Sequence, residues 1–383
     1  MDPAVKSWLC EEVSRFDHQA PVEEAWMPPS SWYTEASFLQ LETDSVFAHS
    51  WQPIARLDQL KDPGQYVTGC LFGEPWVLLR NQSGELRGFF NSCRHKGREV
   101  VQGCGRADEL VCGYHAWTYD LEGGLKRAPR IAGIREFDRA KTSLPPLRIE
   151  TWGPWVFANL SGEAAPLRPG LSELDRRLGA SGWDDLCFVG RTTWDIGCNW
   201  KVYADNYLDG GYHIPHMHPT LDAQIDMKTY KTEVFDSYSI QTAEPSSQTD
   251  DRIDYDSDAR IGAGAIYAWL YPNFTMNRYG PCLDTNWIIP KGPDRCQVVY
   301  EFFFARTEGE DAQRFIDEST EQSAVTQRED ISICESVQVG LSSRSYDRGR
   351  YAPQVEVGEY HFHQLLAGDL RRALRLDEPV ATR

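Results

Sequence analysis

The stretches Cys93-Arg94-His95 and Cys112-Gly113-Tyr114-His115 decide the fold of this chain, and sixteen residues separate them. Each stretch offers one thiolate and one imidazole, so the two together form a four-ligand metal site. Zinc accepts such a set, but a zinc finger takes its two cysteines from one end and its two histidines from the other. Alternation of Cys and His instead favours a [2Fe–2S] cluster, in which one iron takes both thiolates and the other takes both imidazoles.

The sequence around these stretches predicts short strands joined by tight turns. The runs 76–80 and 85–90 flank Asn81-Gln82-Ser83-Gly84, a composition typical of a hairpin turn. The run 115–120 and the run 125–127 flank a second such turn. Cys104 lies between the two ligand stretches but outside their pattern, so we predict that it is not a ligand.

A second concentration of metal-binding residues lies further along the chain. His213, His216 and His218 are three of the nine histidines and fall within six residues. Two neutral imidazoles and one carboxylate can bind Fe(II) on one face and leave the opposite face open. A pair of histidines is more often structural, but here the histidines follow another metal motif in the same chain.

Together these motifs resemble the α-subunits of Rieske non-haem iron oxygenases, and the resemblance extends from about Phe47 to the C-terminus. The family's catalytic motif ends in His-x4-His. This spacing implies His213 and His218 as ligands of a mononuclear Fe(II), with His216 as the rival. The resemblance also implies that Cys93, His95, Cys112 and His115 hold a Rieske [2Fe–2S] cluster.

The third iron ligand of this family is a carboxylate on a long helix downstream, and the sequence predicts a helix from about Asp311 to Val339. Position in the family pattern implies Asp330, with Glu329 and Glu335 as rivals. Helical spacing places small or apolar residues on the face of Asp330, as expected for a buried ligand. These are Ser323, Thr326, Ile333, Cys334 and Val337.

These oxygenases are usually trimers in which the cluster of one subunit lies next to the iron of its neighbour. A carboxylate beside the first iron histidine then bridges the two centres, usually three residues before it. Here that position is Gly210, and the acid is Asp209. The resemblance therefore implies Asp209 as the catalytic bridge, with Asp205 as the second possibility and Asn206 in the same catalytic stretch.

Several stretches resemble the choline monooxygenase-like branch more specifically: 205–213, 271–274, 277–281 and 345–351. The implied substrate is choline or a related quaternary amine, which aromatic faces hold through cation–π attraction. The aromatic residues expected to bind it are Trp269, Tyr271, Phe274, Tyr279 and Trp287.

One cation, Arg278, lies in the same stretch. We predict that it pairs with Asp284, because an Arg278 that points at the iron would favour a carboxylate substrate instead. Alternatives to choline hydroxylation are N-demethylation of a betaine and hydroxylation of an aromatic ring or aromatic acid. A Rieske electron carrier is the alternative from another class, and a second metal set in the ~200 residues after the cluster domain disfavours it.

We predict an α+β chain: an N-terminal Rieske [2Fe–2S] antiparallel β-domain followed by a C-terminal α+β catalytic domain of the helix-grip (START-like) type. Residues 1–45 form a helical segment that packs on the catalytic domain. Residues 46–165 form the Rieske domain, and residues 166–383 form the catalytic domain. The chain has no nicotinamide or flavin motif, so we expect ferredoxin or a reductase to supply the electrons for O2-dependent monooxygenation or dioxygenation.

The net charge of −18 argues against nucleic acid or an anionic membrane as a partner. Residues 80–130 are an exception, with nine Lys/Arg against six Asp/Glu, and this basic segment suits an acidic electron donor. No apolar stretch is long enough to span a bilayer. Ten scattered cysteines and no secretory signal favour a reducing compartment, and we predict a cytoplasmic homotrimer.

Overall fold

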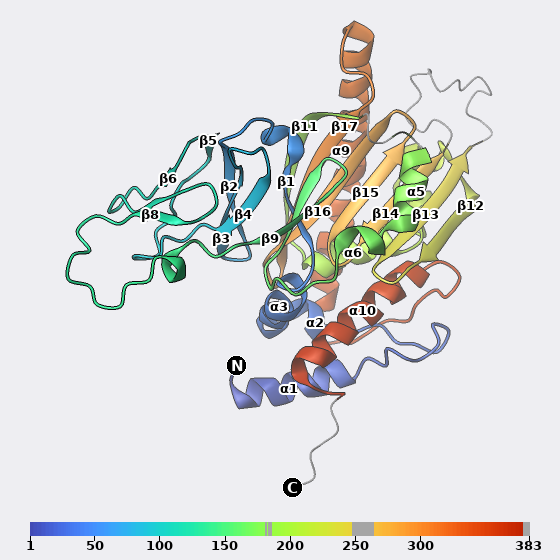
Figure 1. Cartoon of the computed structure of the whole chain (residues 1–383). Helices are drawn as coiled ribbons and strands as arrows, with labels where there is room; N and C mark the ends of the chain where they lie inside the picture. The colour runs from blue at the N-terminus through green and yellow to red at the C-terminus, as the bar shows by residue number, and fades with distance from the viewer. Residues whose placement is uncertain (181, 183–185, 247–263, 378–383) are drawn as a thin grey trace. The chain divides into compact units, whose positions relative to one another are not determined.

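The computed structural model describes residues 1–180, 182, 186–246 and 264–377. The chain divides into two compact units (Figure 1). One unit is Phe47–Pro169, and the other combines Met1–Val46 with Gly170–Arg383. The boundaries of the Rieske domain and the catalytic domain, expected after residues 45 and 165, remain a prediction. None of the described helices is both long and apolar enough to cross a lipid bilayer.

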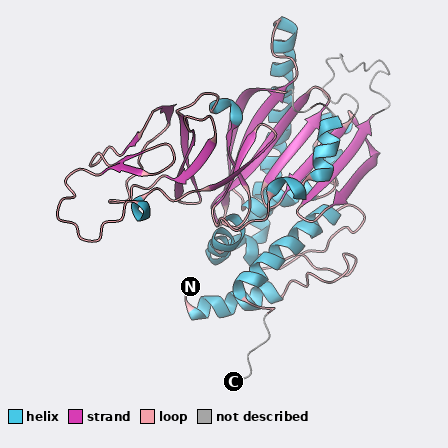
Figure 2. Cartoon of the chain, in the orientation of Figure 1, coloured by secondary structure: helices cyan, strands magenta, loops and turns pink. Residues whose placement is uncertain are grey.

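The unit Phe47–Pro169 is built from three small antiparallel sheets, drawn as magenta arrows in Figure 2. The predicted first hairpin is confirmed, because β3 pairs with β4 and Arg80 faces Leu86. The sheet orders are β1-β10-β9, β4-β3-β2-β5 and β6-β7-β8. The strands are β1 (Gln52–Arg56), β2 (Gln65–Leu71), β3 (Glu74–Arg80), β4 (Leu86–Phe90), β5 (Cys104–Arg106), β6 (Leu110–Val111), β7 (Thr118–Tyr119), β8 (Leu125–Arg127), β9 (Arg148–Trp152) and β10 (Trp155–Asn159).

The other unit is built on one antiparallel sheet of seven strands, in the order β11-β17-β16-β15-β14-β13-β12. Every residue of β15 is buried, so this strand lies in the middle of the core. The strands are β11 (Cys187–Ile196), β12 (Ile225–Val234), β13 (Tyr238–Pro245), β14 (Ala265–Leu270), β15 (Phe274–Tyr279), β16 (Cys282–Gly292) and β17 (Arg295–Phe304).

Helices pack on one face of this sheet. Ser323 of α9 donates a hydrogen bond to Asp284 of β16, and Tyr203 of α6 contacts Tyr300 of β17. The predicted long helix is α9, and Glu310 and Asp311 in its first turn complement the helix dipole. The helices are α1 (Pro3–Ser14), α2 (Ser31–Thr34), α3 (Ala36–Glu42), α4 (Leu167–Gly170), α5 (Ser172–Ala180), α6 (Trp200–Leu208), α7 (Ile214–Met217), α8 (Pro219–Asp222), α9 (Glu310–Leu341) and α10 (Val357–Leu374). The predicted α+β class is confirmed.

A buried ion pair fixes the N-terminal segment to α6. Lys201 Nζ lies 2.6 Å from Glu42 Oε1, and both side chains are 0% exposed. Trp200 Nε1 donates to the other oxygen of Glu42 at 2.7 Å. Burial raises the pKa of Glu42 and lowers the pKa of Lys201, so each charge depends on the other to stay ionised.

We expect Glu42→Ala to destabilise the protein by about 3–5 kcal/mol, because it leaves Lys201 charged and buried without a partner. Chemical denaturation of the purified chain measures the change. The double variant Glu42→Leu with Lys201→Met should recover most of the loss, and removal of the exposed pair Arg328–Glu321 should change little. Equal effects of the buried and exposed substitutions would contradict this assignment.

Candidate functional site

The two Cys–His stretches form two loops of similar geometry. In the first, Cys93 N–H donates to Arg98 O, and Gly97 N–H donates to Cys93 O, both at 2.8 Å. In the second, Cys112 N–H donates to Trp117 O at 2.8 Å, and Ala116 N–H donates to Cys112 O at 3.0 Å. Both sequences therefore turn the chain back on itself, which puts a Cys and a His on one side of each loop.

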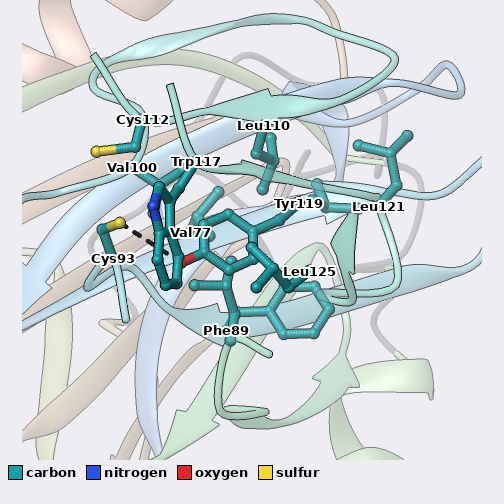
Figure 3. Close-up of a cluster of buried hydrophobic side chains, with 12 residues drawn as sticks. Val77, Phe89, Cys93, Val100, Leu110, Cys112, Trp117, Tyr119, Leu121 and Leu125 are labelled. Carbon is teal, nitrogen blue, oxygen red and sulfur yellow. Dashed lines mark hydrogen bonds between the residues drawn. The ribbon is translucent and has the colours of Figure 1, made fainter. Parts of the chain in front are cut away.

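The four predicted cluster ligands differ in exposure. Cys93 and Cys112 are buried and belong to an apolar cluster with Trp117 and Tyr119, and Figure 3 shows both sulfurs at one end of it. His95 and His115 are exposed, and their ring centroids lie 4.6 Å apart. The thiolate side of the site is thus shielded, while the imidazole side can meet an electron partner.

Two further contacts support this site. The ring of His95 stacks on Trp117 at 5.0 Å, and Tyr119 Oη lies 3.4 Å from Cys93 Sγ. Burial and the contact with Cys93 raise the pKa of Tyr119, which keeps its hydroxyl proton available to the sulfur. Hydrogen bonds to cluster sulfurs tune the reduction potential. Cys104 lies exposed on β5.

His213, His218 and Asp330 come together although Asp330, on α9, lies more than 110 residues after both histidines. Their ligand atoms all lie within 4.8 Å of one another. Asp330 Oδ1 is 3.0 Å from His218 Nε2 and 3.8 Å from His213 Nε2. Two imidazoles and one carboxylate on one side of a cavity form a donor set that suits Fe(II).

Neighbouring carboxylates orient both rings. His213 Nδ1 donates to Asp209 Oδ2, and His218 Nδ1 donates to Glu329 Oε2, both at 2.6 Å. Each Nε2 is thereby left to face Asp330, which is the usual arrangement of imidazole ligands. Burial lowers the pKa of His218, but Asp330 and Glu329 together raise it above its usual value. The site thus favours a positive charge where a metal would bind.

The predicted alternatives for the iron ligands make other contacts or are exposed. His216 is exposed. Glu335 accepts a hydrogen bond from Gly197 N–H at 2.9 Å, and Glu329 contacts the outer nitrogen of His218. The buried face of α9 is more polar than predicted, since it includes Gln327 and Gln338, whereas Val337 is exposed.

Two glycines after α6 explain why no carboxylate stands three residues before His213. Gly210 and Gly211 both have positive φ, 72° and 74°. A Cβ on Gly210 would lie 2.2 Å from Val355 O, so no side chain fits there. The carboxylate beside His213 is therefore that of Asp209. It also accepts hydrogen bonds from the backbone N–H groups of Tyr212 and His213, both at 3.1 Å.

The other two predicted catalytic residues lie on α6 and point to different partners. Asn206 Nδ2 donates to Asp330 Oδ1 at 2.9 Å. Asp205 Oδ1 lies 3.1 Å from His363 Nε2, away from the iron ligands. Sequence reasoning missed His363 because it is 158 positions from Asp205 and has no motif of its own.

A cavity of about 200 Å³ lies beside His213, His218 and Asp330. The described residues that line it include acids but no Lys or Arg. Six tyrosines contribute to the wall: Tyr203, Tyr207, Tyr230, Tyr267, Tyr279 and Tyr300.

The aromatic residues predicted for substrate binding, Tyr279 excepted, do not line this cavity, which corrects that prediction. Side chains alternate along a strand, and the lining residues Asn277, Tyr279, Asp284 and Asn286 fix which side faces the cavity. Phe274 on β15 and Trp287 on β16 alternate with these lining residues, so their side chains lie on the opposite face of the sheet. Trp269 packs on Phe362 of α10 at 5.4 Å, and Tyr271 Oη donates to Asp369 of the same helix at 2.7 Å.

Arg278 is buried, and because it lies between Asn277 and Tyr279 on β15, its side chain faces away from the cavity. It is not among the lining residues. Asp284, its predicted partner, lines the cavity and so lies on the other face of the sheet. Asp284 accepts a hydrogen bond from Asn277 at 2.5 Å, on the cavity side of the sheet.

Comparison with known proteins identifies two domains in this chain. Residues 50–138 match the Rieske [2Fe-2S] domain, and residues 183–370 match the ring hydroxylating alpha subunit (catalytic domain). The chain is 41% identical over 372 residues to the chloroplastic choline monooxygenase of Arabidopsis thaliana, which covers 94% of this chain and 86% of that protein. The chain belongs to the Rieske non-haem iron oxygenases.

Two further relatives of this Rieske oxygenase act on quaternary amines by name. The carnitine monooxygenase oxygenase subunit of Escherichia coli (strain K12) is 31% identical over 360 residues, covering 90% of this chain and 94% of that one. The quaternary ammonium Rieske monooxygenase CntA, in complex with L-carnitine, superposes with a TM-score of 0.76 at 27% identity, covering 91% and 96%. Naphthalene 1,2-dioxygenase from Rhodococcus sp. shares the fold at 18% identity and a TM-score of 0.74 over 99% and 100%.

A Rieske oxygenase is an oxidoreductase that holds a [2Fe–2S] cluster and a mononuclear iron. It takes electrons from a donor and oxygenates a small molecule with O2. The presence of the catalytic domain excludes the alternative of a simple electron carrier for this chain.

We expect Cys93→Ser to remove the visible absorption of the cluster together with product formation, because a serine oxygen does not replace a cluster thiolate. His213→Ala should retain that absorption and lose the mononuclear iron. Iron and acid-labile sulfide analysis checks both variants, and three irons per chain are expected for the intact protein. Stoichiometric zinc without sulfide would contradict the cluster.

Asp330→Ala should lower the mononuclear iron content as His213→Ala does. Glu329→Ala is the matched control on the same turn of α9, and it should retain iron with weaker affinity because it removes only the partner of His218 Nδ1. If Asp330→Ala retains iron and Glu329→Ala loses it, Glu329 is the iron ligand and Asp330 is not.

Proposed function

We propose that this Rieske oxygenase hydroxylates choline or a closely related quaternary amine. The carrying observation is the cavity beside His213, His218 and Asp330, which is lined by tyrosines and acids and, among its described residues, by no Lys or Arg. Aromatic faces attract a quaternary ammonium, and a buried like charge would repel it. The names of the choline and carnitine monooxygenase relatives support the same substrate class.

We assign Cys93, His95, Cys112 and His115 as the cluster ligands, supported by their two matching loops. We assign His213, His218 and Asp330 as the iron ligands, supported by the spacing of their nitrogen and oxygen atoms. The iron, when bound, supplies the activation of O2. The balanced reaction is R–H + O2 + 2e⁻ + 2H⁺ → R–OH + H2O, and choline would give betaine aldehyde hydrate.

The residues of the chain have separate tasks in this reaction. The tyrosine wall holds the cationic group, so that a C–H bond of the substrate faces the iron ligands. Asp209 and Glu329 hold the tautomers of His213 and His218 through their Nδ1 atoms. Asn206 fixes one oxygen of Asp330, and this hydrogen bond orients the carboxylate.

We further infer that the chain works as a trimer and that Asp209 bridges the iron of one subunit to the cluster of the next. Asp209 already binds His213 Nδ1. It lines both the cavity beside the iron ligands and a second cavity, whose wall includes Glu356. The exposed His95 and His115 suit contact with a neighbouring subunit. The electron donor is proposed to be ferredoxin or a reductase.

The cytoplasmic location remains a prediction. The plant relatives are named as chloroplastic, so a plastid is the alternative compartment.

We expect Asp209→Asn to retain both metal centres and to slow electron transfer between them, because a neutral amide cannot accept N–H groups from two imidazoles as a carboxylate can. Single-turnover kinetics of the reduced cluster measure this rate. Asp205→Asn is the matched control one turn earlier on α6. If the rate falls in Asp205→Asn and not in Asp209→Asn, Asp205 is the bridge.

Tyr230→Leu should raise the KM for choline by about 3- to 30-fold, the loss of one cation–π contact of 0.5–2 kcal/mol. Trp287→Leu is the control from the opposite face of the sheet, and its KM should stay close to that of the intact enzyme. Wild type should also bind 3,3-dimethylbutan-1-ol, the neutral isostere of choline, much more weakly. Equal binding of choline and the isostere would contradict a cationic substrate.

A further inference from the structure

A second group of metal-binding side chains lies outside the iron site. The ligand atoms of Asp205, Glu359 and His363 all lie within 4.8 Å of one another. Asp205 is on α6, and the other two are on α10, one turn apart. None of the three belongs to the ligand sets of the cluster or of the iron.

His363 is held in the same way as the two iron histidines. Its Nδ1 lies 2.7 Å from the hydroxyl of Tyr351, as His213 and His218 each have an oxygen 2.6 Å from Nδ1. Its Nε2 faces Asp205 Oδ1 at 3.1 Å, close to the 3.0 Å between His218 Nε2 and Asp330 Oδ1. The hydroxyl of Tyr33 lies 2.9 Å from the same nitrogen and offers a further oxygen.

Glu359 is the independent indication that something positive belongs here. The residue as a whole is only 5% exposed and lines a cavity, and within the described part of the chain its carboxylate has neither a hydrogen bond nor an ion pair. Burial and the charges of Asp205, Glu356 and Asp209 raise its pKa well above the usual value. An ionised carboxylate is costly to bury without compensation, and a bound cation or a proton would compensate Glu359.

A cation has a way in. Asp205 and Glu359 line a second cavity of about 220 Å³, whose wall also includes Asp209 and Glu356. The described residues of its wall include no Lys or Arg. The nearby cation, Lys201, is already paired with Glu42.

We propose that Asp205, Glu359 and His363 bind a second divalent cation, separate from the mononuclear iron. One imidazole nitrogen and two carboxylates suit Mn²⁺, Zn²⁺ or Fe²⁺ better than Mg²⁺, which prefers oxygen ligands alone. The cation neutralises the two carboxylates and ties α10 to α6. This proposal does not depend on the identity of the substrate.

Mn²⁺ is the probe, because free Mn²⁺ gives a six-line electron paramagnetic resonance signal that falls on binding. We expect one Mn²⁺ to bind per chain of iron-loaded wild type, and metal analysis of the enzyme as purified should find one divalent ion beyond the three irons. Glu359→Gln should weaken Mn²⁺ binding by at least about 100-fold. Tyr351→Phe, which removes only the partner of His363 Nδ1, should weaken it about 10-fold.

Two controls separate this site from the others. Asp330→Ala should retain Mn²⁺ binding at the second site, and Glu356→Gln should also retain it, because neither change removes a proposed ligand. Mn²⁺ binding that is absent, or that Glu359→Gln leaves unchanged, would overturn the proposal. A carboxylic acid infrared band that Glu359→Gln removes from metal-free wild type at neutral pH, without Mn²⁺ binding, would identify a proton as the occupant instead.

Discussion

The buried pair of Glu42 and Lys201 is the constraint on which the catalytic half of this protein depends. Lys201 lies at the start of α6, and without the carboxylate its charge would be buried alone. The same helix then directs Asp205 toward His363 and Asn206 toward Asp330, and Asp209 follows at its end beside His213. The N-terminal segment therefore does more than cover the sheet, since it fixes the helix that orients the site.

The backbone after α6 shows how a family position can move without losing its chemistry. Gly210 occupies the position where the family resemblance implies an acid, but its positive φ and the close approach of Val355 O leave no room for one. Asp209, one residue earlier, still reaches His213 Nδ1 because the turn folds back toward the ring. The carboxylate beside His213 therefore lies one residue earlier in the sequence than the family resemblance implies.

The sequence was most informative where the chemistry is local and least informative where it depends on packing. Two Cys–His loops and a His-x4-His spacing predict the family, because neighbours in sequence supply most of the ligands. Four aromatic residues predicted for substrate binding do not line the cavity beside the iron ligands: Trp269, Tyr271, Phe274 and Trp287. A shift of one residue reverses the face of a strand, and α10 covers one end of the sheet; neither fact can be read from composition. The group around His363 joins residues too far apart to form a motif.

The cavity beside the iron ligands has walls of two kinds, and this has a consequence for changing what the enzyme accepts. Tyr203 and Tyr207 come from α6, where each substitution also disturbs the helix that positions the metal ligands and the polar contacts behind it. Tyr230, Tyr267 and Tyr279 come from the strands of the sheet, which carry none of the proposed ligands. Laboratory evolution of the substrate range should therefore tolerate most substitutions among the tyrosines of the strands, because these positions can change while the metal ligands stay in place.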